Sequence, residues 1–244
     1  MPRLARIAAA AQRPPLSPEQ QRVLDLSQWM TPAWLAKVVV EIADVGSTTH
    51  VLEPNFGTGE IVTAALCAGA AHVVGVEIDE KLARWNTGIL RCAGASPARF
   101  SPLVGDFLET SAERFCLDEV GRFDVATMNP PYENGADLAH VLHALTLADR
   151  AVAVLRLNAL TGKKRTNALW SRFDVRQVLV CAERPDFGEH ARSVGGFSRN
   201  ASPGAESDFC VVDILARPRR LGSRPSFDWI RRPQPESHGD RRSP

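Results

Sequence analysis

Short apolar segments alternate with helical stretches along most of this chain, and this alternation is the strongest constraint on its fold. It predicts a parallel sheet with helices on both faces, that is, a single doubly wound α/β domain. The apolar segments expected as strands are 50–53, 71–77, 101–104, 124–128, 151–157, 176–181 and 209–215. The expected helices are 18–25, one that Thr31 caps with Pro32 in its first turn, and 61–68, 80–92, 136–147 and 166–173.

The composition is that of one soluble globular domain. The 244 residues are 44% hydrophobic and 23% charged, with a formal net charge of +1, which is ordinary for a domain of this size. We expect the domain to span 18–232, between a flexible tail at 1–17 and a disordered tail at 233–244. Small basic clusters such as Lys163-Lys164-Arg165 can contact phosphates, but most such clusters are only solvated surface.

Several classes of protein are disfavoured by residue spacing. The five cysteines are scattered without a Cys-x-x-Cys pair, and the histidines make no His-x-x-x-His pair, so we expect no metal site and no disulfide framework. His140 and His143 are interpreted as one face of a helix. No apolar run approaches the roughly 18 residues that a membrane span needs. These features predict a cytoplasmic protein with no membrane partner.

A glycine-rich loop follows the first predicted strand, in the sequence VLEPNFGTGE. A strand, a glycine-rich turn and a helix together present backbone N–H groups to a ligand, and Gly57 and Gly59 let the backbone approach it closely. Val62 stands where the dinucleotide fingerprint needs a third glycine. The loop therefore suits a nucleoside carrying an amino-acid group, whose ammonium Glu53 could meet, although a simple tight turn remains an alternative.

Acidic residues end the next two predicted strands. Glu77 can accept hydrogen bonds from both hydroxyls of a ribose, while Ile78 can pack on an adenine face. Asp106 can accept from an adenine amine, with Phe107 packing beside it. Each acidic residue alone is more often an ordinary loop residue, but three successive strands ending in suitable groups predict an adenosine-type cofactor.

The fourth predicted strand ends in Asn129-Pro130-Pro131-Tyr132. Two prolines cannot continue a sheet ladder, so a strand-ending turn is the simplest interpretation. A site that needs fixed hydrogen-bond acceptors and a flat ring is the alternative that the preceding cofactor motifs favour.

Taken in this order, the motifs resemble those of S-adenosylmethionine-dependent N6-adenine DNA methyltransferases, in particular small phage-like members. The resemblance is carried by WMTPAWL, LEPNFGTGE, VGVEID, GDFLE and NPPY, and further on by VLVCAERPDF and SDFCVVDI. It implies a Rossmann-like domain with a mostly parallel, seven-stranded sheet whose last strand is antiparallel. It also adds further residues to the implied S-adenosylmethionine site, namely Thr31, Pro54, Asn55, Phe56 and Asn129.

The implied chemistry explains the residue types in NPPY. The lone pair of an adenine amine is delocalised into the ring, so acceptors at the Asn129 side chain and the Pro130 carbonyl would make the nitrogen more nucleophilic. Tyr132 would stack on a base flipped out of DNA, with Phe187 or Phe197 as the second stacking ring. Phosphate contacts are expected from Lys163, Lys164, Arg165 and Arg172.

Three interpretations remain open from the sequence. DNA adenine methylation leads; the same fold acting on RNA or on a protein glutamine amide is second, because enzymes of those classes share NPPY. A catalytically silent nucleic-acid-binding protein is third. Only 112 residues follow Tyr132 (244 − 132), so we expect no large recognition domain, and a specificity partner is conceivable while the oligomeric state is not predicted.

Overall fold

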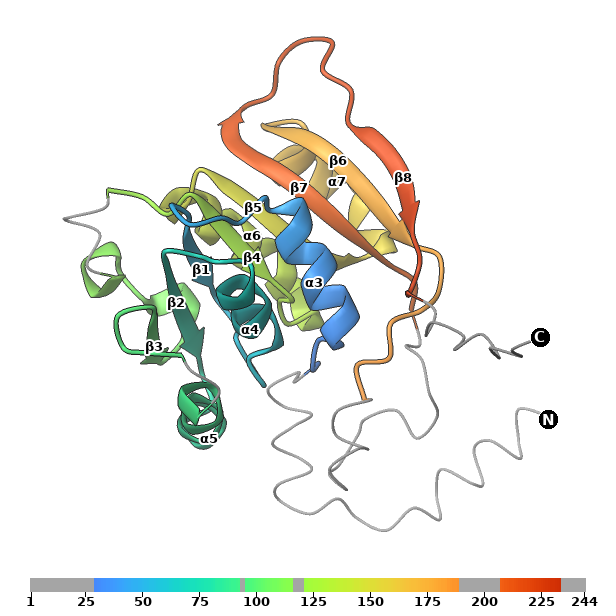
Figure 1. Cartoon of the computed structure of the whole chain (residues 1–244). Helices are drawn as coiled ribbons and strands as arrows, with labels where there is room; N and C mark the ends of the chain where they lie inside the picture. Colours follow the sequence, from blue (N-terminus) through green and yellow to red (C-terminus); the bar gives the residue numbers. More distant parts are fainter. Residues whose placement is uncertain (1–28, 93–94, 116–120, 189–206, 234–244) are drawn as a thin grey trace, which may run out of the picture.

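The computed structural model describes residues 29–92, 95–115, 121–188 and 207–233 (Figure 1). The predicted helix 18–25, the tail 1–17, nearly all of the tail 233–244, and Phe197 lie outside these residues. The described elements, with the labels of Figure 1, are α3 (Ala33–Ile42), β1 (His50–Glu53), α4 (Glu60–Cys67), β2 (His72–Glu77), α5 (Glu80–Cys92), β3 (Phe100–Val104), η1 (Phe107–Glu109), η2 (Ala112–Phe115), β4 (Val125–Met128), η3 (Glu133–Gly135), α6 (Ala136–Leu147), β5 (Arg150–Arg156), η4 (Leu157–Leu160), α7 (Lys163–Arg165), η5 (Thr166–Trp170), β6 (Phe173–Cys181), β7 (Phe209–Pro218) and β8 (Ser226–Ile230).

The strands form one sheet in the order β3-β2-β1-β4-β5-β7-β6-β8. Strands β1 to β5 are parallel to one another, and β7 is antiparallel to both β5 and β6. The order reverses at β1, which lies between β2 and β4. In doubly wound sheets such a reversal opens a crevice at the carboxyl ends of the strands.

The doubly wound fold is confirmed, with one strand more than expected. All seven predicted strands are present, and β8 adds an eighth by pairing in parallel with β6. The antiparallel strand β7 is therefore not the last one. Because β6 would otherwise be the edge of the sheet, the short segment 226–230 can complete its hydrogen bonds with few buried side chains of its own.

Two apolar layers cover the two faces of the sheet. Successive residues of β1 show the division: Val51 belongs to the layer under α3, α4 and α5, and Leu52 to the layer under α6. Figure 1 shows α3 and α4 on the near face and α6 behind the sheet. Because both faces are covered, central strands such as β5 are apolar at nearly every position.

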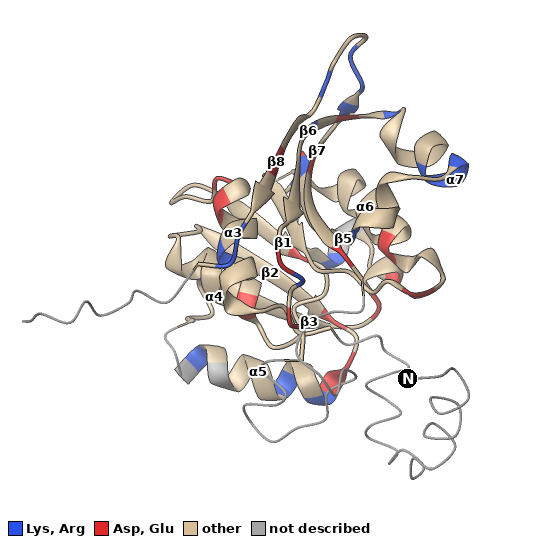
Figure 2. Ribbon diagram, turned by 90° about the vertical axis from the view of Figure 1, so that its right-hand side faces the viewer, with Lys and Arg blue, Asp and Glu red and all other residues tan. Residues whose placement is uncertain are grey.

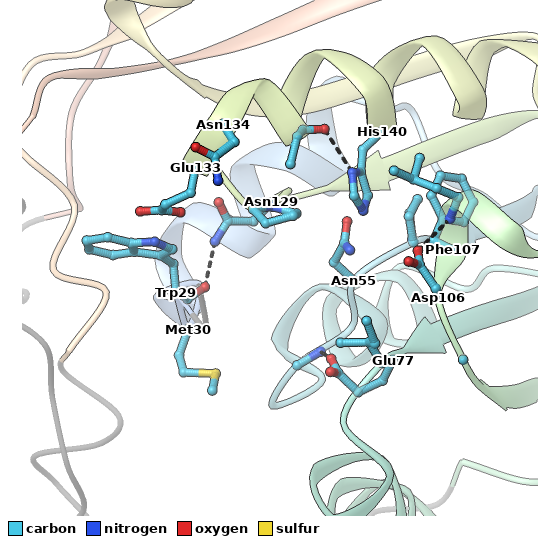
Figure 3. Close-up of a pocket in the computed structure, with 17 residues that line it drawn as sticks. Trp29, Met30, Asn55, Glu77, Asp106, Phe107, Asn129, Glu133, Asn134 and His140 are labelled. Atoms are coloured by element: carbon cyan, nitrogen blue, oxygen red, sulfur yellow. Dashed lines mark hydrogen bonds between the residues drawn. The ribbon is translucent and has the colours of Figure 1, made fainter. Parts of the chain in front are cut away.

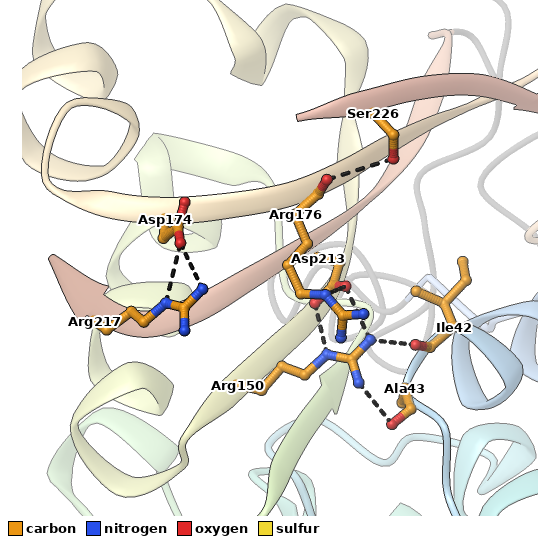
Figure 4. Close-up of polar contacts among 8 residues, drawn as sticks. All are labelled: Ile42, Ala43, Arg150, Asp174, Arg176, Asp213, Arg217 and Ser226. Atoms are coloured by element: carbon orange, nitrogen blue, oxygen red, sulfur yellow. Dashed lines mark hydrogen bonds and ion pairs between the residues drawn. The ribbon is translucent and has the colours of Figure 1, made fainter. Parts of the chain in front are cut away.

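The end of α3 is tied to the sheet by a buried ion pair. Arg150 on β5 donates from Nε and Nη2 to the carboxylate of Asp213 on β7, at 2.7 and 2.9 Å. The same guanidinium donates to the carbonyls of Ala43, at 3.0 Å, and Ile42 (Figure 4). A cation at a helix C-terminus satisfies unpaired carbonyls and complements the helix dipole, so this contact fixes the direction of α3.

Two local predictions were wrong in detail. Pro32, not Thr31, is the N-cap of α3, and no side chain caps it; the Pro32 carbonyl accepts from Leu35 N and Ala36 N instead. The helix expected at 166–173 is observed as α7 and η5, which together span 163–170. Strand β6 then begins at Phe173 because β7 extends to Pro218 and pairs with it there.

Candidate functional site

A pocket of about 350 Å³ lies at the carboxyl ends of β1, β2, β3 and β4 (Figure 3). Its lining includes nine residues predicted for cofactor binding or catalysis: Pro54, Asn55, Gly57, Glu77, Ile78, Asp106, Phe107, Asn129 and Pro131. It also includes residues that were not predicted, among them Trp29, Met30, Glu133, Asn134 and His140. The motifs predicted to bind an adenosine-type cofactor and the Asn-Pro-Pro corner therefore share one cavity.

The glycine-rich loop has the backbone that its sequence predicts. Gly57 has φ +50° and Gly59 has φ +84°, in the left-handed region, and Gly59 is the N-cap of α4. A Cβ at Gly59 would come within 2.9 Å of Leu90 on α5. Glycine is thus needed at this position for both conformation and space.

Glu53 lies beneath the loop and is completely buried. Its carboxylate accepts from the Asn55 N–H at 3.4 Å and from the Thr127 hydroxyl at 3.3 Å. Burial raises its pKa well above the ordinary value, and the two hydrogen bonds only partly oppose this. With Thr31 and Phe56, Glu53 lines a small cavity that adjoins the loop and shares Trp29, Met30, Asn55 and Gly57 with the main pocket.

Glu77 connects the end of β2 to the same loop. One carboxylate oxygen accepts from Gly57 N and the other from Asp79 N, both at 2.9 Å. Burial raises the pKa of Glu77, while these N–H groups oppose the rise. Asp79 accepts from Lys81 N and Leu82 N at the start of α5, as expected of a capping residue.

Asp106 and Phe107 follow β3 as predicted. Asp106 caps η1 by accepting from Leu108 N at 2.9 Å, and Phe107 is buried. The imidazole of His140, on α6, lies 5.6 Å from the Phe107 ring. The histidines were interpreted as one helix face, and no spacing signal marked His140 as a pocket residue.

Asn129 is held at both ends of its side-chain amide. The nitrogen donates to the backbone carbonyl of Trp29 at 2.7 Å, and the oxygen accepts from the Tyr132 hydroxyl. Figure 3 shows the Asn129 amide beside Trp29 on the pocket wall. Pro131 also lines the pocket, and Pro130 is buried.

Tyr132 differs from the expected open stacking ring. Only 4% of it is exposed, and it is not among the pocket-lining residues. Its ring packs against Phe209 and Trp29, with centroids 5.3 and 6.3 Å away, and the Arg156 guanidinium lies over it at 5.0 Å. Base stacking by Tyr132 therefore stays a prediction, and in this conformation the ring is covered.

The residues predicted to contact nucleic acid are divided between surface and core. Lys163 and Lys164 are exposed on α7 (Figure 2). Arg165 binds Asp137 in the first turn of α6 at 2.8 Å, and Arg172 lies over the Phe173 ring. Phe187 is buried against Trp29 and Phe209. The Arg165–Asp137 ion pair therefore connects α7 to α6, the helix that follows NPPY. Phe187 instead packs in the aromatic cluster that contains Tyr132 of NPPY.

Within its described residues, the chain holds neither a candidate metal centre nor a candidate membrane span. No group of three or more His, Cys, Asp or Glu residues gathers there in a way that could hold a metal ion. None of its helices is long and apolar enough to cross a membrane.

No protein-family model matches the chain. A curated relative, ribosomal RNA small subunit methyltransferase A from Corynebacterium jeikeium, is 31% identical over 122 residues. The match covers 49% of this chain, which spans only 38% of that relative's length.

Similar folds occur among solved methyltransferase structures. The type I restriction-modification methyltransferase subunit from Streptococcus thermophilus has a TM-score of 0.62 and 17% identity, over 79% of this chain and 45% of that one. Magnesium protoporphyrin IX methyltransferase from Synechocystis, solved with bound S-adenosylmethionine, has a TM-score of 0.52 and 13% identity, over 85% and 87%. The chain thus has the Rossmann-like α/β fold of these methyltransferases.

Proposed function

We propose that this protein is an S-adenosylmethionine-dependent methyltransferase that modifies the N6 amine of adenine in DNA. The observation that carries the proposal is the shared pocket: Glu77 and Asp106 line the same cavity as Asn129 and Pro131. A methyl donor on the first pair and an amine on the second would therefore meet in one cavity. Bringing two reactants together in this way supplies a large part of a rate enhancement.

The residues present fit the proposed cofactor. Among the described residues, the pocket lining contains no Lys or Arg, which suits a cationic sulfonium better than a phosphate-bearing nucleotide. Glu77 offers a carboxylate to the ribose, Asp106 offers one to the adenine amine, and the backbone of Gly57 permits close approach. When bound, S-adenosylmethionine supplies an electrophilic methyl group.

Asn129 activates the amine in this proposal. The hydrogen bond to the Trp29 carbonyl fixes the orientation of the amide, so its oxygen is the atom left to accept a hydrogen from the target. A carbonyl oxygen has two lone pairs, and the Tyr132 hydroxyl takes one of them. The second would accept a hydrogen of the amine and so hold its nitrogen toward the methyl group that bound S-adenosylmethionine would supply, and the proton that the amine loses on methylation would pass to water.

RNA is the second candidate substrate. The observation in its favour is the 31% identity to a ribosomal RNA methyltransferase. The chemistry at Asn129 would be the same, because the exocyclic amine of adenine is identical in both nucleic acids. The shared pocket would also admit a glutamine amide as the acceptor, whereas a pocket that joins both groups of residues gives no support to the catalytically silent alternative.

Methyl transfer can be tested directly with a matched pair of variants. Wild type, Asn129→Ala and Asn158→Ala are expressed in a host without adenine methylation, and N6-methyladenine is measured in DNA and RNA by mass spectrometry. Asn158 is an exposed asparagine after the next strand, β5, and serves as the control. We expect methylated DNA with wild type and Asn158→Ala, and a loss of about 10²- to 10³-fold with Asn129→Ala.

The other outcomes separate the alternatives. Methylated RNA with unmodified DNA would show that the substrate is RNA and not DNA. Unmodified DNA and RNA, together with a methylated glutamine amide found by mass spectrometry of the host proteins, would exclude both nucleic acids. Methylation that persists in Asn129→Ala would refute the role of this side chain.

A further inference from the structure

The hydrogen-bonding state of His140 can be read from its surroundings. Its Nδ1 lies 2.8 Å from the Ala136 carbonyl, one helical turn earlier. A carbonyl oxygen can only accept, so Nδ1 carries the hydrogen. In a neutral imidazole the other nitrogen, Nε2, is then an acceptor.

The imidazole is held neutral by its environment. Burial lowers the pKa of His140, and nearby His143 acts in the same direction; the Ala136 carbonyl, Asp106 and Asp137 oppose the shift. A lowered pKa leaves the ring uncharged at neutral pH. Nε2 therefore presents a lone pair rather than a hydrogen to its surroundings.

His140 lines the pocket beside other side chains that can accept hydrogen bonds, namely Asp106 and Asn55. Figure 3 shows His140 and Asp106 on the same side of the cavity, with the Asn55 amide directed toward them. Asn55 Oδ1 is buried and accepts no hydrogen bond from the described residues. A ligand seated here must supply hydrogens, since buried acceptors left without donors are costly.

We propose that His140, together with Asp106, selects a 6-aminopurine in the cofactor: the two hydrogens of its exocyclic amine are accepted by the Asp106 carboxylate and by Nε2 of His140. This inference rests on the proposed function and deepens it. A 6-oxopurine would direct a carbonyl oxygen at both acceptors and is rejected. A purine with only hydrogen at carbon 6 leaves both acceptors unsatisfied.

The test couples a change in the ligand to a change in the protein. S-adenosylhomocysteine and its analogues with 6-hydrogen or 6-oxo purines are titrated calorimetrically into wild type, His140→Phe and His143→Phe. Phenylalanine keeps a ring against Phe107 but removes the acceptor. His143 also packs on Phe107, with centroids 4.7 Å apart, yet does not line the pocket, so it provides the matched control.

We expect wild type and His143→Phe to prefer the amino ligand over the 6-hydrogen analogue. In His140→Phe this preference should shrink about 3- to 10-fold, the contribution of one hydrogen bond. An unchanged preference in His140→Phe would overturn the inference while S-adenosylhomocysteine binding still supported the proposed function. Failure of wild type to bind S-adenosylhomocysteine would instead overturn the proposed function.

A second measurement needs no variant and so does not depend on the folding of His140→Phe. Imidazole ¹⁵N shifts of His140 in wild type report the protonation and hydrogen bonding of each ring nitrogen. The amino ligand should shift the unprotonated Nε2 signal, whereas the 6-hydrogen analogue should leave it nearly unchanged. Equal shifts with both ligands, or protonation at Nε2 in the free protein, would contradict the assignment.

Discussion

Replacing Arg150 with methionine should destabilise the domain by about 3 kcal/mol. The substitution keeps most of the aliphatic volume but leaves Asp213, which is 0% exposed, without its two closest donors. Removing one partner of a buried ion pair costs about 3–5 kcal/mol. The lower end applies here because Arg176, half exposed, lies 3.6 Å from Asp213 and can partly replace the lost charge. Such a loss is a large share of the roughly 5–15 kcal/mol that stabilises a typical domain.

Urea unfolding followed by circular dichroism measures this loss as a lower midpoint at unchanged slope. Arg122→Met is the control, because Arg122 also binds an aspartate, Asp149, and backbone carbonyls, but its ion pair is solvated. That pair should contribute at most about 1 kcal/mol. Adding Asp213→Asn to Arg150→Met should recover part of the stability by removing the stranded charge. Equal costs for Arg150→Met and Arg122→Met would refute the reasoning.

Three further predictions concern the pocket and its surroundings. Burial raises the pKa of Glu53 and Glu77 above the ordinary value of 4.5, so their protonated forms favour the folded state. Thermal melts should show that this stabilisation of the folded state is lost as the pH rises from 4.5 through the pKa values of the folded protein. Over the same pH range S-adenosylhomocysteine should bind more tightly, because the two carboxylates ionise. The double substitution Lys163→Glu with Lys164→Glu should weaken nucleic-acid binding. The binding constant should also depend less steeply on salt concentration, by the equivalent of about two phosphate contacts. The same charge change at Arg220 and Arg224, in the turn between β7 and β8 and outside the lining of the main pocket, should do less. Gly59→Ala should cost about 1–2 kcal/mol in urea unfolding because of its positive φ, whereas Gly88→Ala, on α5 with open space around it, should stabilise by about 0.5–1 kcal/mol.

The central strands could be predicted because both of their faces are buried. In β5 nearly every position is apolar, and that pattern is independent of which neighbours the strand acquires. Strand β8 gave no such signal: Pro225 precedes it, and Phe227 and Trp229 remain more than half exposed. Its existence depends on the free edge of β6, which is a property of the assembled sheet.

The residues of the candidate site likewise fall into those that could be predicted from the sequence and those that could not. Gly57, Glu77 and Asp106 could be placed because each lies at or shortly after the carboxyl end of a strand, which must face the crevice. Trp29 and His140 could not, because they enter the pocket from the segment before α3 and from the second turn of α6. Their positions depend on how the helices pack. Arg150 binds the carbonyls at the end of α3 and so orients that helix, and α6 is held by its buried face.

The covered ring of Tyr132 is compatible with base stacking if Arg156 is displaced. The guanidinium lies over the ring, and its ion pair with Glu133 is long, at 3.5 Å. A cation over an aromatic ring contributes about 0.5–1 kcal/mol at exposed sites and about 2 kcal/mol or more where the ring is desolvated, as Tyr132 is, whereas a stacked base contributes about 1–3 kcal/mol. The two contributions are therefore of similar size, and exchange of the guanidinium for a base would need a further gain, which the released Arg156 would supply by binding a phosphate of the incoming nucleotide. In the free protein, Arg156 would then keep the stacking face dry until a base replaces it.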